Sequence, residues 1–193
     1  MDNSTITLLH YHALSRIGQG GYGEVYVAWD SKLRRQVAIK RLKAQARLRQ
    51  HDSLLREARM AASLRHPAFV QIFAIEEDAG SQAIVMELIQ GQTWRELTDT
   101  AQPALPLALA MIRQLAEAME VAHASGLVHG DLKPSNLMLD PDGKVRILDL
   151  GLALRDTAQT TTTPVPHEQP GTIAYMAPER LQGMAPTLSL IHI

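Results

Sequence analysis

The chain has 193 residues, of which 46 % are hydrophobic and 20 % are charged, and its net charge is −1 at pH 7. These values are typical of a globular protein with one domain or two small lobes, and they give no electrostatic reason to expect binding of nucleic acid or anionic lipid. The absence of cysteine excludes disulfides and thiolate metal sites. Neither a signal peptide nor a run of about 18 apolar residues is present. We therefore expect a cytoplasmic chain with no membrane contact in this segment, although an anchor in a following region would not be visible in it.

The first part of the chain predicts an antiparallel sheet with one helix. From Leu14 to Leu42 the pattern is strand, glycine turn, strand, charged turn, strand. Apolar residues on one broad face predict a helix from Leu54 to Leu64, which ends before the His66-Pro67 pair. Two more strands are expected at Phe69 to Ile75 and at Ala83 to Ile89.

The second part predicts one long helix followed by a hairpin. The helix is expected from about Leu107 to Ala124, and because it is apolar nearly all round, we expect it to be buried on several sides. Short apolar runs surround the turn Asp140 to Gly143, which is typical of a hairpin. The Thr- and Pro-rich stretch from Thr157 to Pro170 has no periodicity and predicts a loop.

A glycine-rich segment near the start indicates phosphate binding. Gly18, Gly20 and Gly23 fit the pattern G-x-G-x-x-G, with Val25 two residues later. Glycines at this spacing let backbone N–H groups approach phosphate oxygens without interference from a Cβ. A dinucleotide-binding loop would need a helix after the glycines, and here a strand follows, which disfavours that alternative.

Lys40 ends the strand segment V-A-I-K and is a candidate phosphate ligand. Its ammonium could neutralise the α- and β-phosphates of a nucleotide if a carboxylate held it in place, and Glu57 on the expected helix is the candidate for that role. A solvated surface position is the ordinary alternative for Glu57, which has arginines close to it in the sequence.

The most specific segment runs from His129 to Asn136 and reads H-G-D-L-K-P-S-N. Asp131 could accept the proton of a substrate hydroxyl, and Asn136 could bind Mg²⁺. Asp149, in the segment D-L-G after the expected hairpin, would be a second oxygen ligand of the kind that a hard cation prefers.

With these motifs in one order, and with A-P-E after them, the chain resembles a eukaryotic-type protein Ser/Thr kinase of the sort also common in bacteria, from about Tyr11 to Gly183. The resemblance implies an α+β fold of the two-lobe protein kinase type, with a complete N-lobe and only the first part of the C-lobe. Residues 1–90 would form the N-lobe, an antiparallel sheet plus one helix. Residues 91–183 would form a partial C-lobe with the catalytic and activation segments, and residues 184–193 a tail.

The resemblance also implies a role for each motif residue, with ATP and Mg²⁺ as cofactors, Mn²⁺ as a further candidate metal, and a protein with Ser or Thr as the substrate. The nucleotide would be bound by Gly18, Gly20, Gly23, Val25, Ala38, Lys40, Met86, Glu87 and Ile89. The catalytic residues would be Asp131 as base, Lys133 at the γ-phosphate, and the ion pair of Lys40 with Glu57. Asn136 and Asp149 would hold the metal.

One departure from the family pattern stands out, and two alternative functions stay open. Gly130 stands where the family has the arginine of H-R-D, which normally pairs with a phosphate on the activation loop, so we expect a weaker phosphorylation switch. H-G-D also occurs in small-molecule phosphotransferases of the aminoglycoside and choline kinase type, but these generally lack the glycine loop, V-A-I-K and A-P-E. A nucleotide-binding pseudokinase or scaffold is the other alternative, against which the presence of Lys40, Asp131, Asn136 and Asp149 argues.

The last residues carry a further expectation. Leu188 to Ile193 reads as the translation of DNA that resembles the mosaic-end adapter of transposase-based sequencing libraries, so we expect residues 188–193 to be an artefact and the natural chain to continue. On that view the acceptor-binding helices of the family are missing, and the 193-residue chain itself should fold poorly and have little activity. Leu109, Ile112, Leu115 and Met119 should then be partly exposed.

Overall fold

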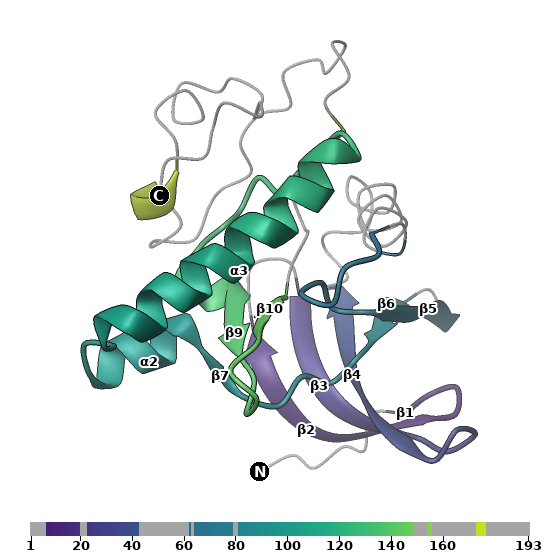
Figure 1. Cartoon of the computed structure of the whole chain (residues 1–193). Coiled ribbons are helices and arrows are strands. Elements are labelled where there is room, and N and C mark those ends of the chain that lie inside the picture. Colours follow the sequence, from purple (N-terminus) through teal and green to yellow (C-terminus); the bar gives the residue numbers. More distant parts are fainter. Residues whose placement is uncertain are drawn as a thin grey trace. The chain divides into compact units, whose positions relative to one another are not determined.

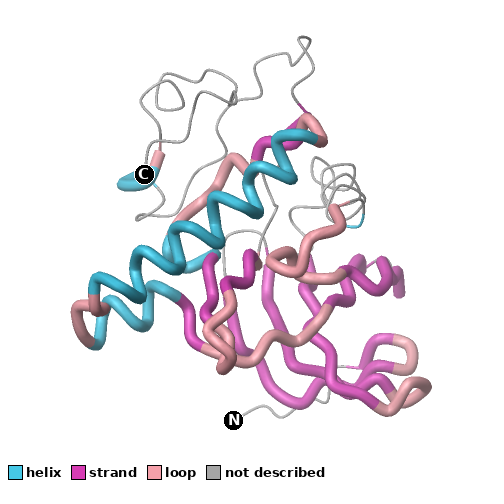
Figure 2. The backbone as a smooth tube through the Cα atoms, viewed as in Figure 1, coloured by secondary structure: helices cyan, strands magenta, loops and turns pink. Residues whose placement is uncertain are grey.

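The structure, a computed structural model, describes residues 7–19, 23–42, 62, 64–78, 81–148, 154–155 and 173–176. The chain divides into two compact units: Met1–Arg59 with Gln71–Ile89, and Met60–Val70 with Gln90–Ile193. Strands make up the described part of the first unit, and the helices α2 and α3 belong to the second (Figures 1 and 2). Most of the helix expected from Leu54 to Leu64 lies outside the described residues.

The first unit is a six-stranded antiparallel sheet with the strand order β1-β2-β3-β4-β6-β5. Its strands are β1 (Thr7–Leu8), β2 (Tyr11–Gln19), β3 (Gly23–Asp30), β4 (Arg35–Leu42), β5 (Ile72–Asp78) and β6 (Ser81–Met86). The three strands predicted between Leu14 and Leu42 are confirmed. The short β1 was not predicted, because two residues are too few to show the alternation that marks a strand.

The two later strands of this sheet differ in position from the expectation. β5 begins at Ile72 rather than at Phe69, because Phe69 instead pairs with Ile147 in an isolated parallel bridge within the second unit. β6 ends at Met86, so Glu87 to Ile89 leave the sheet.

One face of the sheet carries the hydrophobic core of the first unit. Ala28 of β3 lies opposite Val37 of β4, and Ile39 of β4 lies opposite Val85 of β6. Directly opposite side chains in antiparallel strands point to the same face. The buried core cluster on this face consists of Leu8, Tyr11, Ala28, Val37, Ile39, Ala83 and Val85. Each fully buried valine of this cluster stabilises the sheet by roughly 2 kcal/mol relative to an exposed position.

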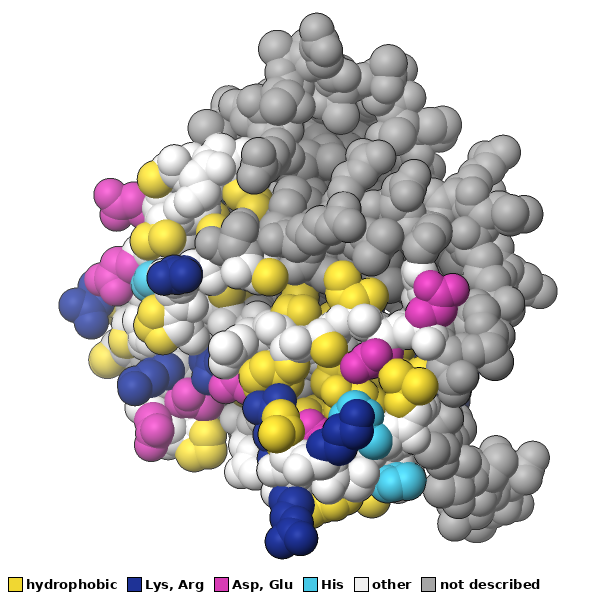
Figure 3. Space-filling view, turned by 90° about the vertical axis from the view of Figure 1, so that its right-hand side faces the viewer, with side chains coloured by type: hydrophobic (Ala, Val, Ile, Leu, Met, Phe, Trp, Pro, Cys, Tyr) yellow, Lys and Arg dark blue, Asp and Glu magenta, His cyan; other side chains and the backbone are white. Residues whose placement is uncertain are grey.

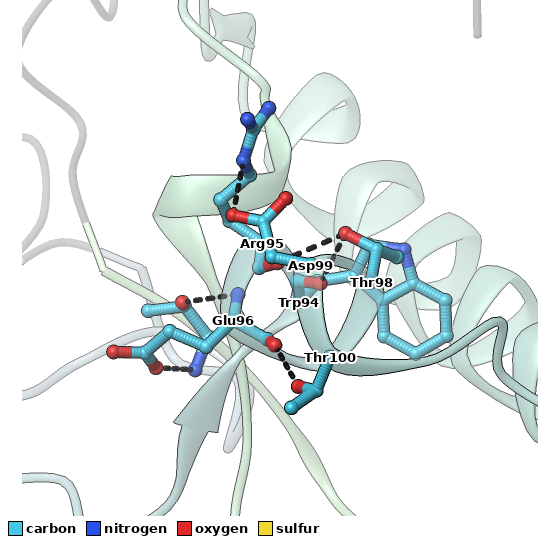
Figure 4. A network of polar contacts seen from close by, with 7 residues as sticks. Trp94, Arg95, Glu96, Thr98, Asp99 and Thr100 are labelled. Carbon is cyan, nitrogen blue, oxygen red and sulfur yellow. Dashed lines mark hydrogen bonds and ion pairs between the residues drawn. The ribbon is translucent and has the colours of Figure 1, made fainter.

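The second unit contains a short helix that was not predicted, α2 (Trp94–Thr100). It begins with a capping box: Glu96 N–H donates to the Thr93 hydroxyl (3.1 Å), and Thr93 N–H donates to Glu96 Oε2 (2.7 Å). Further along, Arg95 binds Asp99 at 2.9 Å, and the Thr100 hydroxyl donates back to the Glu96 carbonyl (Figure 4). Side chains thus form hydrogen bonds with backbone groups at both ends of this two-turn helix, which stabilises it.

The long helix is α3 (Leu105–Ala124), close to its predicted bounds. Its buried residues are Met111, Leu115, Ala118, Met119 and Ala122, which recur at helical spacing along one stripe. Leu109 and Ile112 are exposed, as predicted, whereas Leu115 and Met119 are buried, so that part of the prediction is wrong. The expectation of burial on several sides is also wrong, because the apolar residues outside this stripe remain exposed.

The described part of the second unit also contains a hairpin, three further short strands and two 3₁₀ turns. The predicted hairpin is confirmed: β9 (Leu137–Leu139) pairs with β10 (Val145–Ile147), and β7 (Gln92–Thr93) adds to β9. β8 (Leu127–Val128) pairs with β11 (Leu154–Arg155). Two 3₁₀ turns are η2 (Pro134–Asn136) and η3 (Ile173–Tyr175). The buried side chains of the hairpin belong to the interior of this unit. In the sequence, the hairpin connects Asn136 to the segment that leads to Asp149.

The described surface has a mixed charge pattern. On the face in Figure 3, acidic and basic side chains are interspersed rather than gathered by sign. Among the described residues, no helix has the length and apolar character needed to cross a membrane.

Candidate active site

Four of the predicted nucleotide-binding residues share one face of the sheet. Val25 of β3 lies opposite Lys40 of β4, and Ala38 of β4 lies opposite Met86 of β6. Ala38 and Lys40 are two residues apart on one strand and so point to the same side. Since directly opposite residues also share a face, Val25, Ala38, Lys40 and Met86 lie together, on the side of the sheet opposite to Val37 and Ile39 of the core.

Lys40 is the charged member of this face, and it is only 9 % exposed. A lysine at this depth is almost always compensated by a charge or by hydrogen bonds, because desolvating an ammonium is costly. Glu57, the predicted partner, lies outside the described residues. The structure therefore supports a buried cation in this position and leaves its pairing with Glu57 as a prediction.

The described glycines of the predicted phosphate loop differ in their surroundings. Gly18 lies opposite Val25 next to a register shift in β2, and Gly23 is buried at the start of β3, while Gly20 lies outside the described residues. A Cβ added to Gly18 would come no closer than 3.6 Å to Val25, which is an ordinary contact. Packing within the sheet therefore does not require glycine at position 18.

The chain leaves the sheet at Met86 and continues through Glu87 and Ile89, the predicted adenine contacts. Glu87 N–H donates to the Gln71 carbonyl (2.9 Å), and Gln71 N–H donates to Glu87 Oε2 (3.3 Å). Both Glu87 and Ile89 are half-buried. These contacts fix the direction in which the backbone leaves β6.

In the second unit, Asp131, Lys133 and Asn136 form one polar cluster. Lys133 Nζ lies 2.7 Å from Asp131 Oδ2, and Asn136 Nδ2 donates to the Asp131 carbonyl (2.8 Å) and to Asp131 Oδ2 (3.1 Å). Asp131 N–H donates to His129 Nδ1 (3.3 Å), and His129 is buried. The structure thus brings the predicted base and its predicted neighbours into direct contact.

The local sequence explains why this cluster forms. Pro134 begins the turn η2, where its fixed φ suits a first helical position and its missing N–H costs nothing. Asn136 N–H donates to the Lys133 carbonyl (2.9 Å), which closes the turn and returns the Asn136 side chain toward Asp131. Asn136 is 8 % exposed, so its side-chain amide is held by the hydrogen bonds to Asp131 rather than by water.

Comparison with known proteins shows which family has this arrangement. A family model described as the protein kinase domain matches residues 11–189. The chain belongs to the protein kinase family. The resemblance inferred from its motifs is therefore confirmed.

The curated relatives of this kinase domain include three bacterial proteins. It is 40 % identical over 182 residues to the probable serine/threonine-protein kinase SCO3848 of Streptomyces coelicolor, covering 86 % of this chain and 26 % of the relative. It is 36 % identical over 188 residues to PknA of Mycobacterium tuberculosis, covering 92 % of this chain and 43 % of the relative. It is 32 % identical over 211 residues to PknD of Protochlamydia amoebophila, covering 92 % of this chain and 21 % of the relative. Both are named serine/threonine-protein kinases. The chain spans less than half the length of each of these relatives.

Gly130 lies inside the predicted catalytic loop, at the position where the resemblance implies an arginine. Its φ is +77°, in the left-handed region that favours glycine. An arginine at this position would adopt that conformation at a cost of about 1 kcal/mol. The backbone of this loop is therefore consistent with the glycine that the sequence has.

Kinases of this family generally use ATP and Mg²⁺, and the donor atoms here suit that metal. Both hydrogen bonds of the Asn136 amide nitrogen go to Asp131, so Asn136 Oδ1 is the atom left to act as a ligand. Leu148 N–H donates to the Asn136 carbonyl (2.9 Å), which brings the residue before Asp149 next to Asn136. Asp149 lies outside the described residues. Amide and carboxylate oxygens are the ligands that Mg²⁺ prefers, so the residues fit the ion.

Two other features of the described residues bear on the site. No group of three or more His, Cys, Asp or Glu among them is placed to hold a metal ion. A hollow of about 500 Å³ lies along α3, lined by Leu115, Ala116, Met119, Glu120, His123, Ala124 and Leu132. Its lining includes none of Asp131, Lys133 and Asn136.

Sequence reasoning missed Gln114 of α3, which contacts the hairpin between Asn136 and Asp149. Its carboxamide makes two hydrogen bonds to the hairpin backbone, at Gly143 and Val145. A single polar residue on a helix gives no sequence signal for such a contact, because its partners are about 30 residues away.

Proposed function

We propose that the chain contains the catalytic machinery of an ATP-dependent protein serine/threonine kinase. The observation that carries this proposal is the contact of Asp131 with Lys133 at 2.7 Å and with Asn136 at 3.1 Å. It puts a carboxylate, an ammonium and an amide around one point, which is the set that phosphoryl transfer to a hydroxyl requires. The names of the bacterial relatives support Ser and Thr as acceptors.

The proposed reaction moves the γ-phosphoryl group of ATP to a protein hydroxyl. The hydroxyl oxygen forms a bond to the γ-phosphorus while the bond from that phosphorus to the β–γ bridging oxygen breaks, and ADP leaves with the bridging oxygen. The hydroxyl proton passes to Asp131. Lys133 neutralises charge on the transferred group, and Asn136 keeps the Asp131 carboxylate in place through its amide nitrogen. Catalysis comes from position and charge rather than from covalent chemistry with the protein.

Asn136 and Asp149 would hold Mg²⁺, with Mn²⁺ as a substitute. When bound, the metal neutralises the β- and γ-phosphate oxygens. Lys40, kept in place by Glu57, would bind the α- and β-phosphates. The sheet face with Val25, Ala38 and Met86 would contact the adenine ring, while the Glu87 carbonyl and the Ile89 N–H bind its edge. Gly18, Gly20 and Gly23 would cover the phosphates.

The same residues and the relatives distinguish the proposed protein kinase from the two alternative functions. A pseudokinase or scaffold does not need Asp131, Lys133 and Asn136 in contact, and their close network favours an enzyme. A small-molecule phosphotransferase is disfavoured by the relatives, which are named as protein kinases. Protein substrate and regulation are properties of the whole protein and follow from assays, not from this network.

The test measures transfer of labelled γ-phosphate by the full-length product of the gene, to itself and to a general substrate such as casein, with phosphoserine and phosphothreonine identified by mass spectrometry. We expect Asp131→Asn and Asp149→Ala each to reduce the rate by at least about 100-fold. Asp142→Ala is the matched control, because Asp142 is an exposed carboxylate in the hairpin that precedes Asp149. Equal rates for the unchanged protein and Asp149→Ala would refute the enzyme.

A further inference from the structure

Gln114 joins α3 to the hairpin that connects the two proposed metal ligands. Its Nε2 donates to the Gly143 carbonyl (3.1 Å), and its Oε1 accepts from Val145 N–H (3.0 Å). Both ends of one half-buried carboxamide are therefore used, and both partners are backbone groups of the β9–β10 hairpin.

This hairpin is small and has Asn136 and Asp149 at its two ends. β9 starts directly after Asn136, and β10 ends two residues before Asp149. Only three residue pairs join the strands, from Val145 opposite Leu139 to Ile147 opposite Leu137. A hairpin of this length needs support from the rest of the protein. β7 supports β9 by pairing with it, and the end of β10 is held by hydrogen bonds from Ile147 N–H to the Ala68 carbonyl (2.6 Å) and from Val70 N–H to the Ile147 carbonyl (3.3 Å).

The turn closes itself through Asp140 but needs another group to fix it to the helix. Asp140 Oδ1 accepts from Asp142 N–H (3.0 Å) and from Lys144 N–H (2.8 Å), and Gly143 has a φ of +74°. These bonds set the shape of the turn. They do not tie it to α3, whereas the Gln114 carboxamide does.

At the other end of the hairpin, Leu148 N–H donates to the Asn136 carbonyl (2.9 Å). Leu148 is the residue that directly precedes Asp149 in the sequence. A shift of β10 along β9 would therefore change the spacing between Asn136 and Asp149 directly. Val145, which Gln114 holds, is the first residue of β10.

We propose that Gln114 is a positioning residue for the metal ligands: by holding Gly143 and Val145 it fixes the start of β10, as the backbone bonds of Ile147 fix its end, and so contributes to the spacing of Asn136 and Asp149. The inference rests on the proposed kinase function. The chemistry is specific to glutamine, because one side must accept and the other must donate. Glutamate keeps the acceptor for Val145 and loses the donor for Gly143, and methionine has a similar length and neither group.

The experiment compares Gln114→Met and Gln114→Glu in the full-length product of the gene, with Ala122→Gly as control. Ala122 is a fully buried residue of α3, so its change weakens the helix without removing a polar contact to the hairpin. Two quantities are measured: amide hydrogen exchange of Val145 by NMR, and the Mg²⁺ concentration at half-saturation of binding to a fluorescent ATP analogue.

We expect Gln114→Met to speed exchange at Val145 and to raise the half-saturating Mg²⁺ concentration about 10-fold, the usual effect of removing a group that orients a metal ligand. Metal-free nucleotide binding should change by less than about 2-fold, because the sheet residues are untouched. Gln114→Glu should keep Val145 protected and give a smaller rise, and it keeps the test decisive if Gln114→Met does not fold. Ala122→Gly should leave the Mg²⁺ requirement unchanged.

The proposal is overturned if both Gln114 variants need the same Mg²⁺ as the unchanged protein, or if Ala122→Gly raises the requirement as much as Gln114→Met does. The second result would show a purely structural role. A failure of the proposed function looks different, because the unchanged protein would then show no Mg²⁺-dependent nucleotide binding at all, and the metal role of Gln114 would be refuted with it.

Discussion

Asp30 offers a sharp test of how the sheet of the first unit is stabilised. It is 1 % exposed at the end of β3, and its Oδ1 accepts from Leu33 N–H (3.0 Å) and Lys32 N–H (3.1 Å) in the turn to β4. His10 Nε2 lies 3.4 Å from Oδ1, and Arg35 Nε lies 3.6 Å from Oδ2. One carboxylate thus connects β3, the turn after it and the turn before β2.

The expected cost of removing this carboxylate follows from its bonds. Asp30→Ala loses two hydrogen bonds to a charged acceptor, and we expect it to lower the free energy of unfolding by about 2–4 kcal/mol. Asp30→Asn keeps an acceptor oxygen for the turn but loses the charge that faces His10 and Arg35, and we expect a loss of about 1 kcal/mol.

The pH dependence has a definite sign. Burial alone would raise the pKa of Asp30, but the N–H groups of Leu33 and Lys32, with His10 and Arg35 nearby, together lower it below its usual value. Because the pKa is lower in the folded state, the charge stabilises the fold fully above the ordinary carboxyl pKa of about 3.9. This stabilisation is lost as the pH falls below that value and through the folded pKa. Asp30→Asn should therefore show a flatter dependence of stability on pH in this range.

The assay is urea unfolding followed by the fluorescence of Trp29, which directly precedes Asp30. The chain has two tryptophans, so Trp94→Phe is made in every variant to leave Trp29 as the only reporter. Glu77→Ala is the control, because it removes an exposed carboxylate from β5 and should change stability by less than about 0.5 kcal/mol. The proposed role of Asp30 is refuted if Asp30→Ala lowers the free energy of unfolding no more than Glu77→Ala does. It is also refuted if Asp30→Asn has the same pH profile of stability as the protein that keeps Asp30.

Two further predictions concern glycines and the activation loop. Gly18→Ala should change the free energy of unfolding by less than about 1 kcal/mol but raise KM for ATP about tenfold, ~1.4 kcal/mol. Its matched control, Gly91→Ala, should lower the free energy of unfolding by more than about 2 kcal/mol, because Gly91 has a φ of +143° and a Cβ there would clash with the Leu139 carbonyl. Thermal melts and ATP titrations separate the two effects, and a large loss of stability in Gly18→Ala would contradict the first. Changing Thr160, Thr161, Thr162 and Thr163 together to Ala should leave the kinase rate within about tenfold, because Gly130 lacks the side chain that would read a phosphate there. A much larger loss would mean that another cation has that role.

The sequence was most informative where chemistry dictates the residue. The catalytic loop motif assigned Asp131, Lys133 and Asn136 to one proposed site, and the structure brings them into contact because they are close in sequence around a proline turn. Strand alternation predicted β2, β3 and β4, and the structure adds the register that puts Val25 and Lys40 on one face. In each case the information is local, so a pattern of a few residues was sufficient.

Predictions failed where a contact distant in sequence decided the outcome. Phe69 was expected in a strand of the first unit, but its pairing with Ile147 keeps it in the second, and no local pattern reveals that competition. The apolar residues of α3 suggested burial on several sides, yet only one stripe is covered, and Leu109 and Ile112 are exposed. The missed α2 is different, since the capping box of Thr93 and Glu96 was readable in the sequence.

The two parts of the proposed reaction centre differ in how their geometry is secured. The base, its lysine and its asparagine are positioned by bonds that span two and five residues, so the turn at Pro134 is enough to assemble them. The proposed metal ligands Asn136 and Asp149 are 13 positions apart, and the bond from Leu148 to Asn136 closes a hairpin of three residue pairs. A short turn cannot fix that spacing by itself, because a hairpin of this size can shift or fray. The precision that Mg²⁺ demands of its ligands therefore depends on support from outside the hairpin. Two backbone hydrogen bonds to Ala68 and Val70 hold Ile147 near the end of β10, and the two hydrogen bonds of Gln114 hold its start.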